Sequence, residues 1–230
     1  MNIGVIGNNL TSLTLSKALV NKKINVTVFC KYKKKFNKSY RSLGITEKNI
    51  EFLNNEILCV NKKYLNSINQ IDIFTEKNKN KKILNFNKAG KNLFSLIKSE
   101  NLYKFLKNNL YKKKKFKIKI IKKEDFYSNI LKNDNFDLII NCEKNNSIVK
   151  SFFSNNINKD YYSDAYTCII YHKKITNKKA IQIFTKFGPL AFLPISSTET
   201  SVVFSIYKEK NNFNIKDIFK LINNYNKNYL

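Results

Sequence analysis

The sequence predicts an α/β fold in which a lobe built on a parallel sheet is interleaved with a smaller, mainly antiparallel lobe. Two observations lead to this prediction. The chain opens with a strand, a helix and a second strand within residues 2–29, and such a βαβ unit implies parallel pairing. From residue 165 onward the pattern changes to successive strand-like runs without intervening helices, which is typical of an antiparallel meander.

The opening unit follows from its hydrophobic pattern. We expect a short apolar strand over Asn2–Ile6, a polar turn over Gly7–Thr11, an amphipathic helix over Ser12–Val20 and a second strand over Asn25–Phe29. A parallel sheet binds ligands in a crevice at its strand ends. The turn after residue 6 is therefore where we expect a ligand.

The middle of the chain continues the alternation of helices and strands. Helices are predicted over Thr46–Asn54, with Thr46 as N-cap, and over Ser99–Leu110. A strand is predicted over Asn69–Thr75, followed by a polar loop or hairpin tip over Lys77–Lys82.

A lysine-rich segment, residues 112–123, precedes the last part of the first lobe. Phe116, Ile118 and Ile120 alternate with lysines there, which predicts a strand with one apolar face and one lysine face in water. A short helix around Asp125–Leu131 and a strand over Asp137–Asn141 with the apolar run LeuIleIle follow. An apolar strand of that kind is expected to be buried in a parallel sheet.

The remaining elements belong to the second lobe. They are strands over Tyr166–Tyr171, Ala180–Pro194 with a break near Gly188, and Ser201–Tyr207, then a helix over Ile215–Tyr225. We expect the first lobe to occupy residues 1–160, with part of the second inserted around 60–98, and the rest of the second lobe to occupy 161–230.

Composition limits the function classes. The 230 residues carry 43 Lys and Arg against 16 Asp and Glu, a formal net charge of +27. Such a charge suggests a nucleic-acid binder, but Arg41 is the only arginine, and lysine lacks the bidentate contacts that nucleic-acid recognition favours. We attribute much of the charge to A/T-rich codons and expect no specific nucleic acid. A basic nucleic-acid or membrane-surface protein remains an alternative, since lysines attract anionic lipid.

Cysteine and histidine spacing argues against a metal site. The four cysteines are far apart, with no CxxC pair and only His172 as an imidazole partner, whereas zinc sites use closely spaced ligand pairs. Cys30, Cys142 and Cys168 lie in apolar surroundings typical of buried thiols in a reducing cytoplasm. The first residues enter a strand directly, which argues against a secretory signal. We therefore expect a cytoplasmic protein without a metal ion.

The turn after the first strand partly matches a dinucleotide-binding motif. Dinucleotide-binding βαβ units carry GxGxxG, whose glycines let the backbone approach the pyrophosphate. The corresponding residues are Gly7, Asn8, Asn9, Leu10, Thr11 and Ser12, so only the first glycine is present. The acidic residue that would hold the ribose is replaced by Cys30. On spacing alone, a Rossmann-like dinucleotide site and an ordinary βα turn remain alternatives.

Three longer stretches resemble the FAD-dependent aromatic hydroxylases, specifically the branch that acts in ubiquinone biosynthesis. Residues 41–45, ArgSerLeuGlyIle, resemble the arginine-containing segment of that family after its second strand. Residues 136–150 resemble the strand that ends in an AspGly motif followed by SerxValArg. Residues 183–195 and 201–205 resemble the PheThrxxGlyProLeuAlaPheLeuPro stretch and the strand after it.

The resemblance implies a flavoprotein-hydroxylase fold and the activity of an FAD- and NAD(P)H-dependent monooxygenase that hydroxylates a polyprenylated phenol. It also implies an FAD site at Gly7, Asn8, Asn9, Ser12, Arg41 and Glu143, and a substrate site at Phe187, Gly188 and Pro189. The alternatives are that Arg41 is a surface cation and that the GlyPro segment is an ordinary turn between strands. No residue stands out as a catalytic acid or base.

The sequence also departs from the family pattern. Glu143 and Lys144 replace AspGly, Lys150 replaces the arginine of SerxValArg, and the chain ends at Leu230 before the family's later GlyAsp motif. We therefore expect a truncated hydroxylase fold, and two further hypotheses follow. The chain is a non-catalytic relative that serves as a binding or assembly subunit, or it is the front part of a split enzyme. Expected partners are an aromatic polyprenylated substrate, other ubiquinone-biosynthesis proteins and, through peripheral contact, the inner face of an anionic membrane.

Overall fold

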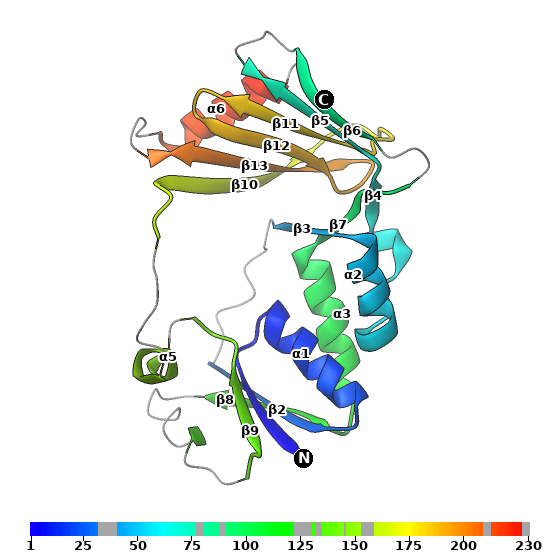
Figure 1. The fold of residues 1–230 in the computed structure, drawn as a ribbon, viewed down its shortest axis with the longest axis vertical. Coiled ribbons are helices and arrows are strands. Elements are labelled where there is room, and N and C mark those ends of the chain that lie inside the picture. Colours follow the sequence, from blue (N-terminus) through cyan, green and yellow to red (C-terminus); the bar gives the residue numbers. More distant parts are fainter. Residues whose placement is uncertain are drawn as a thin grey trace. The chain divides into compact units, whose positions relative to one another are not determined.

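The computed structural model describes residues 1–31, 41–76, 81–87, 91–121, 130–131, 135–144, 146–152, 159–208 and 213–226. These residues form two compact units (Figure 1). The first comprises Met1–Ser39, Lys48–Tyr64 and Ile97–Asn158, and the second comprises Tyr40–Glu47, Leu65–Leu96 and Lys159–Leu230. The fold is α/β, with a parallel sheet in the first unit and mainly antiparallel pairing in the second, as the sequence predicts.

The first unit is built on a parallel sheet in the order β8-β2-β1-β9. Its strands are β1 (Asn2–Ile6), β2 (Asn25–Lys31), β8 (Phe116–Ile121) and β9 (Leu138–Asn141). β1 pairs in parallel with β2 and β9, and β2 pairs in parallel with β8. The carboxyl ends of all four strands therefore lie at one edge of the sheet.

Helices α1 (Leu10–Asn21) and α3 (Ser99–Tyr111) lie side by side against this sheet (Figure 1). Together with the sheet they bury an apolar core, in which Leu13, Leu106 and Leu110 are fully inaccessible to solvent. Helix α2 (Glu47–Phe52) continues into a π-helical turn, η1 (Leu53–Ile57), and a 3-10 turn, η2 (Lys62–Tyr64), follows. The short helix α5 (Ser147–Phe152) contributes Ile148 to a second cluster with Ile6, Phe29 and Ile121.

Two details of the first sheet differ from the sequence prediction. Strand β9 is an edge strand of the described sheet, so Leu138 is 46% exposed rather than buried. In β8, the alternation that was expected to bury Ile120 ends early, because Ile120 is 51% exposed and its neighbour Ile121 is buried. Apolar composition predicted both strands but not which side chains are covered. The helix predicted around 125–131 lies mostly outside the described residues.

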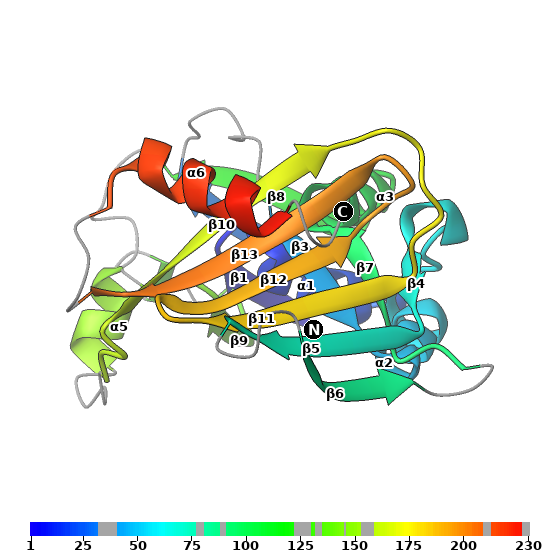
Figure 2. The same ribbon diagram turned by 90° about the horizontal axis from the view of Figure 1, so that it is seen from above.

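The second unit is built on a six-stranded sheet in the order β10-β13-β12-β11-β5-β6. Its neighbouring strands pair antiparallel, except β11 with β5. The bounds are β5 (Gln70–Thr75), β6 (Lys82–Asn87), β10 (Ser163–Tyr171), β11 (Lys179–Thr185), β12 (Gly188–Pro194) and β13 (Glu199–Tyr207). Figure 2 shows helix α6 (Ile215–Asn226) lying across this sheet. Its Ile218 and Ile222 complete a core with Ile183, Leu190 and Phe204.

Most of a three-stranded sheet also belongs to the second unit. It has the order β3-β7-β4 and contains β3 (Ser42–Ile45), β4 (Asn66–Ile68) and β7 (Phe94–Lys98). Ile68 and Leu96 from this sheet pack with Ala180 and Ile195. The sequence did not predict β3, β4, β6, β7 or α5, because these elements are short and their patterns are mixed.

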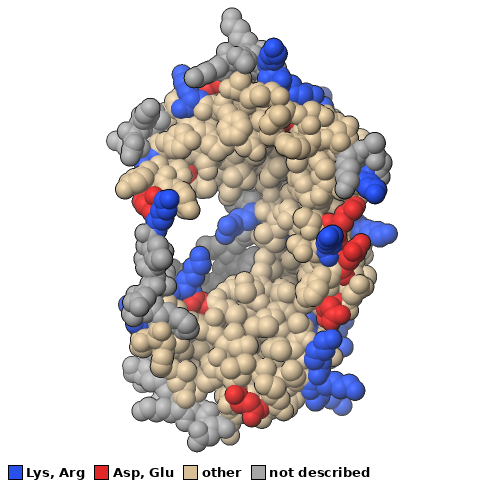
Figure 3. All heavy atoms as spheres, in the orientation of Figure 1, with Lys and Arg blue, Asp and Glu red and all other residues tan. Residues whose placement is uncertain are grey.

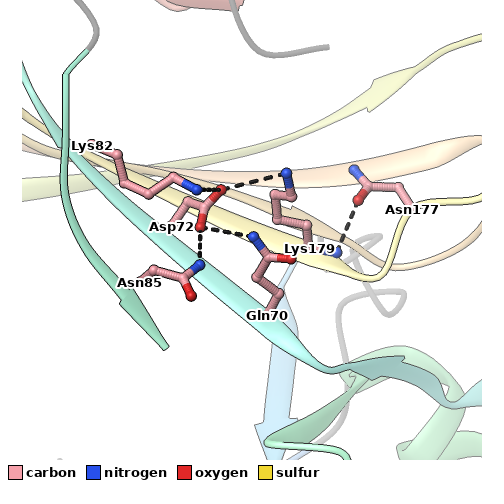
Figure 4. A network of polar contacts seen from close by, with 6 residues as sticks. All are labelled: Gln70, Asp72, Lys82, Asn85, Asn177 and Lys179. Carbon is pink, nitrogen blue, oxygen red and sulfur yellow. Dashed lines mark hydrogen bonds and ion pairs between the residues drawn. The ribbon is translucent and has the colours of Figure 1, made fainter. Parts of the chain in front are cut away.

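Asp72 of the second unit carries a buried carboxylate. Asp72 on β5 accepts hydrogen bonds from the Gln70 and Asn85 amides, and the Lys82 and Lys179 ammonium groups lie 3.1 and 3.4 Å from its Oδ2 (Figure 4). Burial would raise the pKa of Asp72, but these partners outweigh it and lower the pKa to about 2. The group is therefore a charged anchor between β5, β6 and β11.

Within the described part of the chain, no helix combines the length and the apolar composition needed to cross a bilayer. The same residues contain no cluster of three or more His, Cys, Asp or Glu side chains arranged to hold a metal ion.

Candidate functional site

The turn between β1 and α1 lies at the carboxyl edge of the parallel sheet. Gly7 adopts a φ of +116°, and its N–H donates to the Phe29 carbonyl at 2.8 Å. A Cβ added at Gly7 would lie 3.0 Å from Glu143 Cγ and 3.6 Å from the Cys142 carbonyl carbon. The backbone conformation therefore favours glycine here, and the segment after β9 approaches it closely.

Asn9 and Ser12 close the start of helix α1. Asn9 is the N-cap, with an extended φ of −115°. Its Oδ1 accepts from the Ser12 N–H at 3.0 Å, while the Ser12 hydroxyl accepts from the Asn9 N–H at 2.9 Å. This is a reciprocal capping box. Of these turn residues only Gly7 has a positive φ, so Asn9 serves as a cap and not as a substitute for a left-handed glycine.

The Asn9 side chain also ties the turn to the neighbouring strand. Its Nδ2 donates to the Cys142 carbonyl at 2.8 Å, and the Cys142 N–H donates to the Ile6 carbonyl at 2.9 Å. Burial, followed by the nearby Glu143 carboxylate, raises the pKa of the Cys142 thiol. Cys142 is therefore a neutral structural residue near neutral pH rather than a thiolate nucleophile.

Asn8 is held from the other side by helix α3. The Tyr103 hydroxyl donates to Asn8 Oδ1 at 2.8 Å, and Tyr103 is buried. Burial raises the pKa of Tyr103, and the hydrogen bond to Asn8 partly offsets that effect. The side chain thus remains a neutral hydrogen-bond donor that fixes one residue of the turn.

The segment after β9 is ordered by amides. Asn141 Oδ1 accepts from the Glu143 N–H at 3.1 Å and from Asn146 Nδ2 at 2.9 Å. The buried Asn146 in turn accepts from the Val149 N–H at 3.0 Å and so caps α5. This amide network helps to hold Glu143 beside Gly7.

Five of the residues assigned by resemblance to the FAD site therefore lie at one edge of the first unit: Gly7, Asn8, Asn9, Ser12 and Glu143. Arg41 is exposed, directly before β3, and belongs to the second unit. Its contact with a flavin stays a prediction. Sequence reasoning missed Tyr103, Asn141 and Asn146, although the polar run after an apolar strand indicated that Asn141 ends a parallel strand.

Of the residues predicted to lie near the substrate, Phe187 lies in the turn between β11 and β12, and Gly188 and Pro189 begin β12. Gly188 has a φ of +137°, and a Cβ there would lie 2.1 Å from the Ser205 carbonyl oxygen. The Thr185 hydroxyl donates to the Gly188 carbonyl at 2.7 Å and accepts from the Phe187 N–H at 3.1 Å. The Phe187 ring packs edge-on against Phe213, with centroids 5.2 Å apart. Pro189 is half-buried and pairs with Phe184. These contacts give the turn a structural role, and its contact with a substrate stays a prediction.

His172 has two polar contacts at the end of β10. Its Nδ1 lies 2.8 Å from the Lys173 carbonyl, and its Nε2 lies 3.0 Å from the Thr200 hydroxyl. Both ring nitrogens are thus engaged within the protein, which agrees with a structural role.

The first unit fits the diphosphate of a dinucleotide such as FAD better than it fits the adenosine ribose. Gly7 supplies the required backbone, and the twelve-residue helix α1 directs its first N–H groups and positive dipole end toward the turn. At the end of β2, however, Cys30 is 6% exposed and carries a thiol. It cannot accept the two strong hydrogen bonds that an acidic residue offers ribose.

Comparison with known proteins places this fold. The sequence matches no protein-family model and no curated protein. Among solved structures, PqsL, described as a probable FAD-dependent monooxygenase from Pseudomonas aeruginosa, superposes with a TM-score of 0.67 at 9% identity, covering 91% of this chain and 61% of PqsL. A tetrameric 2-methyl-3-hydroxypyridine-5-carboxylic acid oxygenase gives 0.62 at 10%, covering 91% and 59%. CtdE, solved in complex with FAD, gives 0.66 at 11%, covering 97% and 65%.

The chain thus has the fold of the flavoprotein hydroxylases, over nearly all of its own length. It spans less than two thirds of the length of each of these neighbours.

Proposed function

We propose that the chain binds FAD in its first unit and acts as an FAD-dependent monooxygenase-like protein. The observation that carries the proposal is the β1–α1 turn, where a glycine with positive φ precedes a capped helix at the carboxyl edge of a parallel sheet. That arrangement binds the diphosphate of dinucleotides in general. The likeness to flavoprotein hydroxylases supports FAD as the dinucleotide.

In this proposal each polar residue of the turn has a distinct task. The N–H groups of Leu10 and Thr11 and the end of the α1 dipole stabilise the diphosphate. Asn8 and Asn9, fixed by Tyr103 and by the capping box, shape the turn. The Glu143 carboxylate accepts hydrogen bonds from cofactor hydroxyls, and Arg41 contacts the flavin.

The finer proposal concerns the reaction. Bound FAD, once reduced, supplies the oxygen chemistry of hydroxylation, and we propose NAD(P)H as the reductant and a polyprenylated phenol as the substrate. Support comes from the resemblance of residues 183–195 to the corresponding stretch of the ubiquinone-biosynthesis hydroxylases. The aromatic substrate is proposed to lie near Phe187, Gly188 and Pro189.

The cofactor proposal is tested by titrating flavin-free protein with FAD, using calorimetry and quenching of flavin fluorescence. Thr11→Glu puts a carboxylate on the exposed second position of α1. There the carboxylate interacts favourably with the helix dipole but repels a diphosphate. We expect Thr11→Glu to weaken FAD binding at least about tenfold, an effect near 1.4 kcal/mol. Thr14→Glu, one turn further along α1, is the matched control and should bind nearly as the parent does.

Two results would contradict the cofactor proposal: no saturable FAD binding by the parent chain, or equal loss in the two variants. The reaction is tested separately by following NADH and NADPH oxidation with a short-chain prenylated phenol. Hydroxylated product supports the monooxygenase. FAD binding without phenol-dependent oxidation supports the alternative of a non-catalytic binding or assembly subunit.

Charge gives the nucleic-acid alternative no additional support. On the face seen in Figure 3, the Lys and Arg side chains of the described residues lie in separate small groups with Asp and Glu between them, and they do not form one continuous stripe. Solvated lysines of this kind contribute to solubility and to weak, salt-sensitive attraction of anions.

A further inference from the structure

A cavity of about 300 Å³ lies at the amino edge of the parallel sheet in the first unit. This is the edge opposite the β1–α1 turn, because all four strands run the same way. The cavity is lined by Asn2, Asn25, Val26, Thr27, Lys114, Lys115, Lys117, Asn135 and Phe136. Its volume is at the lower end of the range of small-molecule sites.

The floor of the cavity is one face of the sheet. Thr27 pairs in register with Lys117 and with Gly4, so the side chains of Thr27 and Lys117 point to the same face. Asn2 pairs with Asn25, and Asn25 Nδ2 donates to Asn2 Oδ1 at 2.9 Å. With its oxygen engaged in this way, the Asn2 amide still has its NH₂ group to offer a ligand.

An aromatic wall stands beside this floor, next to Gly4 of β1. A Cβ at Gly4 would lie 3.5 Å from Phe136 Cγ and 3.4 Å from Phe29 Cε2. The Phe136 ring is further fixed by edge-on packing against Phe29, with centroids 5.5 Å apart. The cavity thus combines an apolar ring with polar groups in defined positions.

The charge of the lining is positive. It contains three lysines and no acidic residue, and the three ammonium groups have no carboxylate partner among the residues that the structure describes. Asp137, just outside the lining, accepts a hydrogen bond from the Asn2 N–H at 2.7 Å. Lysines this close in sequence repel one another, and an anion between them would relieve that repulsion.

From this juxtaposition we infer that the amino-edge cavity is a binding site for a small organic phosphate that carries a ring. The phosphate lies between Lys117 on the floor and Lys114 and Lys115 on the rim. The amides of Asn2 and Asn25 and the Thr27 hydroxyl donate further hydrogen bonds to it. The ring packs against Phe136. The site is separate from the proposed FAD site, since the two occupy opposite edges of the same sheet.

The test uses phenyl phosphate as probe, at 0.15 M ionic strength, followed by calorimetry and by amide chemical shifts. We expect saturable binding of one molecule with a Kd below about 1 mM. Shifts should concentrate at Asn2, Asn25, Thr27 and Lys117, including the two side-chain amides. Inorganic phosphate, which lacks the ring, should bind more weakly.

Lys117→Gln should weaken phenyl phosphate binding about tenfold, as expected for one charge-assisted contact. Lys112→Gln is the matched control: it removes the same charge from an exposed lysine of the same segment that does not line the cavity. Thermal unfolding of both variants checks that each remains folded. FAD titration of both variants keeps the result independent of the cofactor proposal.

Three outcomes would overturn the inference. The first is that the probe shows no saturable binding. The second is that Lys117→Gln and Lys112→Gln weaken binding equally, which would indicate general attraction to lysines. The third is that amide chemical-shift changes spread over β8 and that duplex DNA or anionic vesicles reproduce them with higher affinity. The last outcome would assign the lysines to a macromolecular surface instead.

Discussion

Two turns in this chain each contain a glycine with positive φ, yet their surroundings differ. At Gly188 a Cβ would lie 2.1 Å from the backbone oxygen of Ser205, whereas at Gly7 the nearest atom would be a side-chain carbon of Glu143 at 3.0 Å. Backbone cannot move aside, but a flexible side chain can. Gly188 is therefore required by the fold of the second unit, and Gly7 leaves its unit room for adjustment. The comparison separates a structural glycine from one suited to a ligand.

The largest expected effect is that of Gly188→Ala. The methyl group would have to displace the carbonyl of β13 and also adopt a strained φ, at a combined cost of about 4 kcal/mol. Hydrogen exchange should show lost protection in residues 179–207, with residues 2–31 protected as before. If the variant is as stable as the parent, the contact with Ser205 does not constrain the turn.

Acid should also distinguish the two units. The pKa of Asp72 in the second unit is lowered to about 2, whereas the segment beside Gly7 is held by neutral amides. A carboxyl group whose pKa is lowered by folding stabilises the folded state at pH values above its pKa in the unfolded chain, near 4. That contribution is lost as the pH falls from about 4 to about 2. Unfolding of the second unit should therefore begin at higher pH than that of the first.

Asp72→Asn should reduce the stability of the second unit by about 2 kcal/mol at pH 7, since it weakens hydrogen bonds made to a charged group. The difference from the parent should shrink as the pH falls toward 2. Asp164→Asn, at an exposed carboxylate of β10 near Lys208, is the control and should cost much less. Denaturant titrations at several pH values measure both. A pH-independent difference would show that the charge of Asp72 does not stabilise the unit.

Gly7→Ala should have a smaller effect on stability, about 1.5 kcal/mol from the positive φ, because Glu143 can move. Its effect on FAD binding should be larger in proportion, since the same movement disturbs the turn that receives the diphosphate. Gly4→Ala, on strand β1 of the same sheet, serves as the control. Gly4 has no positive φ, and an added Cβ would make only ordinary contacts. Loss of stability in Gly7→Ala without loss of FAD affinity would remove the turn from the cofactor site.

Sequence patterns predicted most of the regular elements but fewer of the contacts at the site. The βαβ unit and the strands after residue 165 carry long, clear periodicity, so their positions followed from it. Short strands such as β3 and β4 take their pairing from distant segments, which local pattern does not reveal. The same holds for the site. Gly7 and Asn9 are recognisable by spacing, whereas Tyr103 and Asn146 reach it only through packing of α3 and α5.

The smallest effect concerns Asn9, and it tests whether the capped turn is open to a cofactor. Asn9→Gly introduces the glycine that dinucleotide-binding turns carry at this position. It removes the hydrogen bond that Asn9 Oδ1 accepts from the Ser12 N–H and the one that Asn9 Nδ2 donates to the Cys142 carbonyl. Glycine is a tolerable N-cap, so the unit should lose about 1 kcal/mol or less. Without the Asn9 side chain, the Ser12 N–H can point to a diphosphate, and this variant should bind FAD more tightly than the parent does.

Asn9→Ser keeps a cap for the Ser12 N–H and serves as the comparison; it should leave FAD affinity nearly unchanged. Equal FAD affinity in all three proteins would mean that the Asn9 cap does not compete with the cofactor.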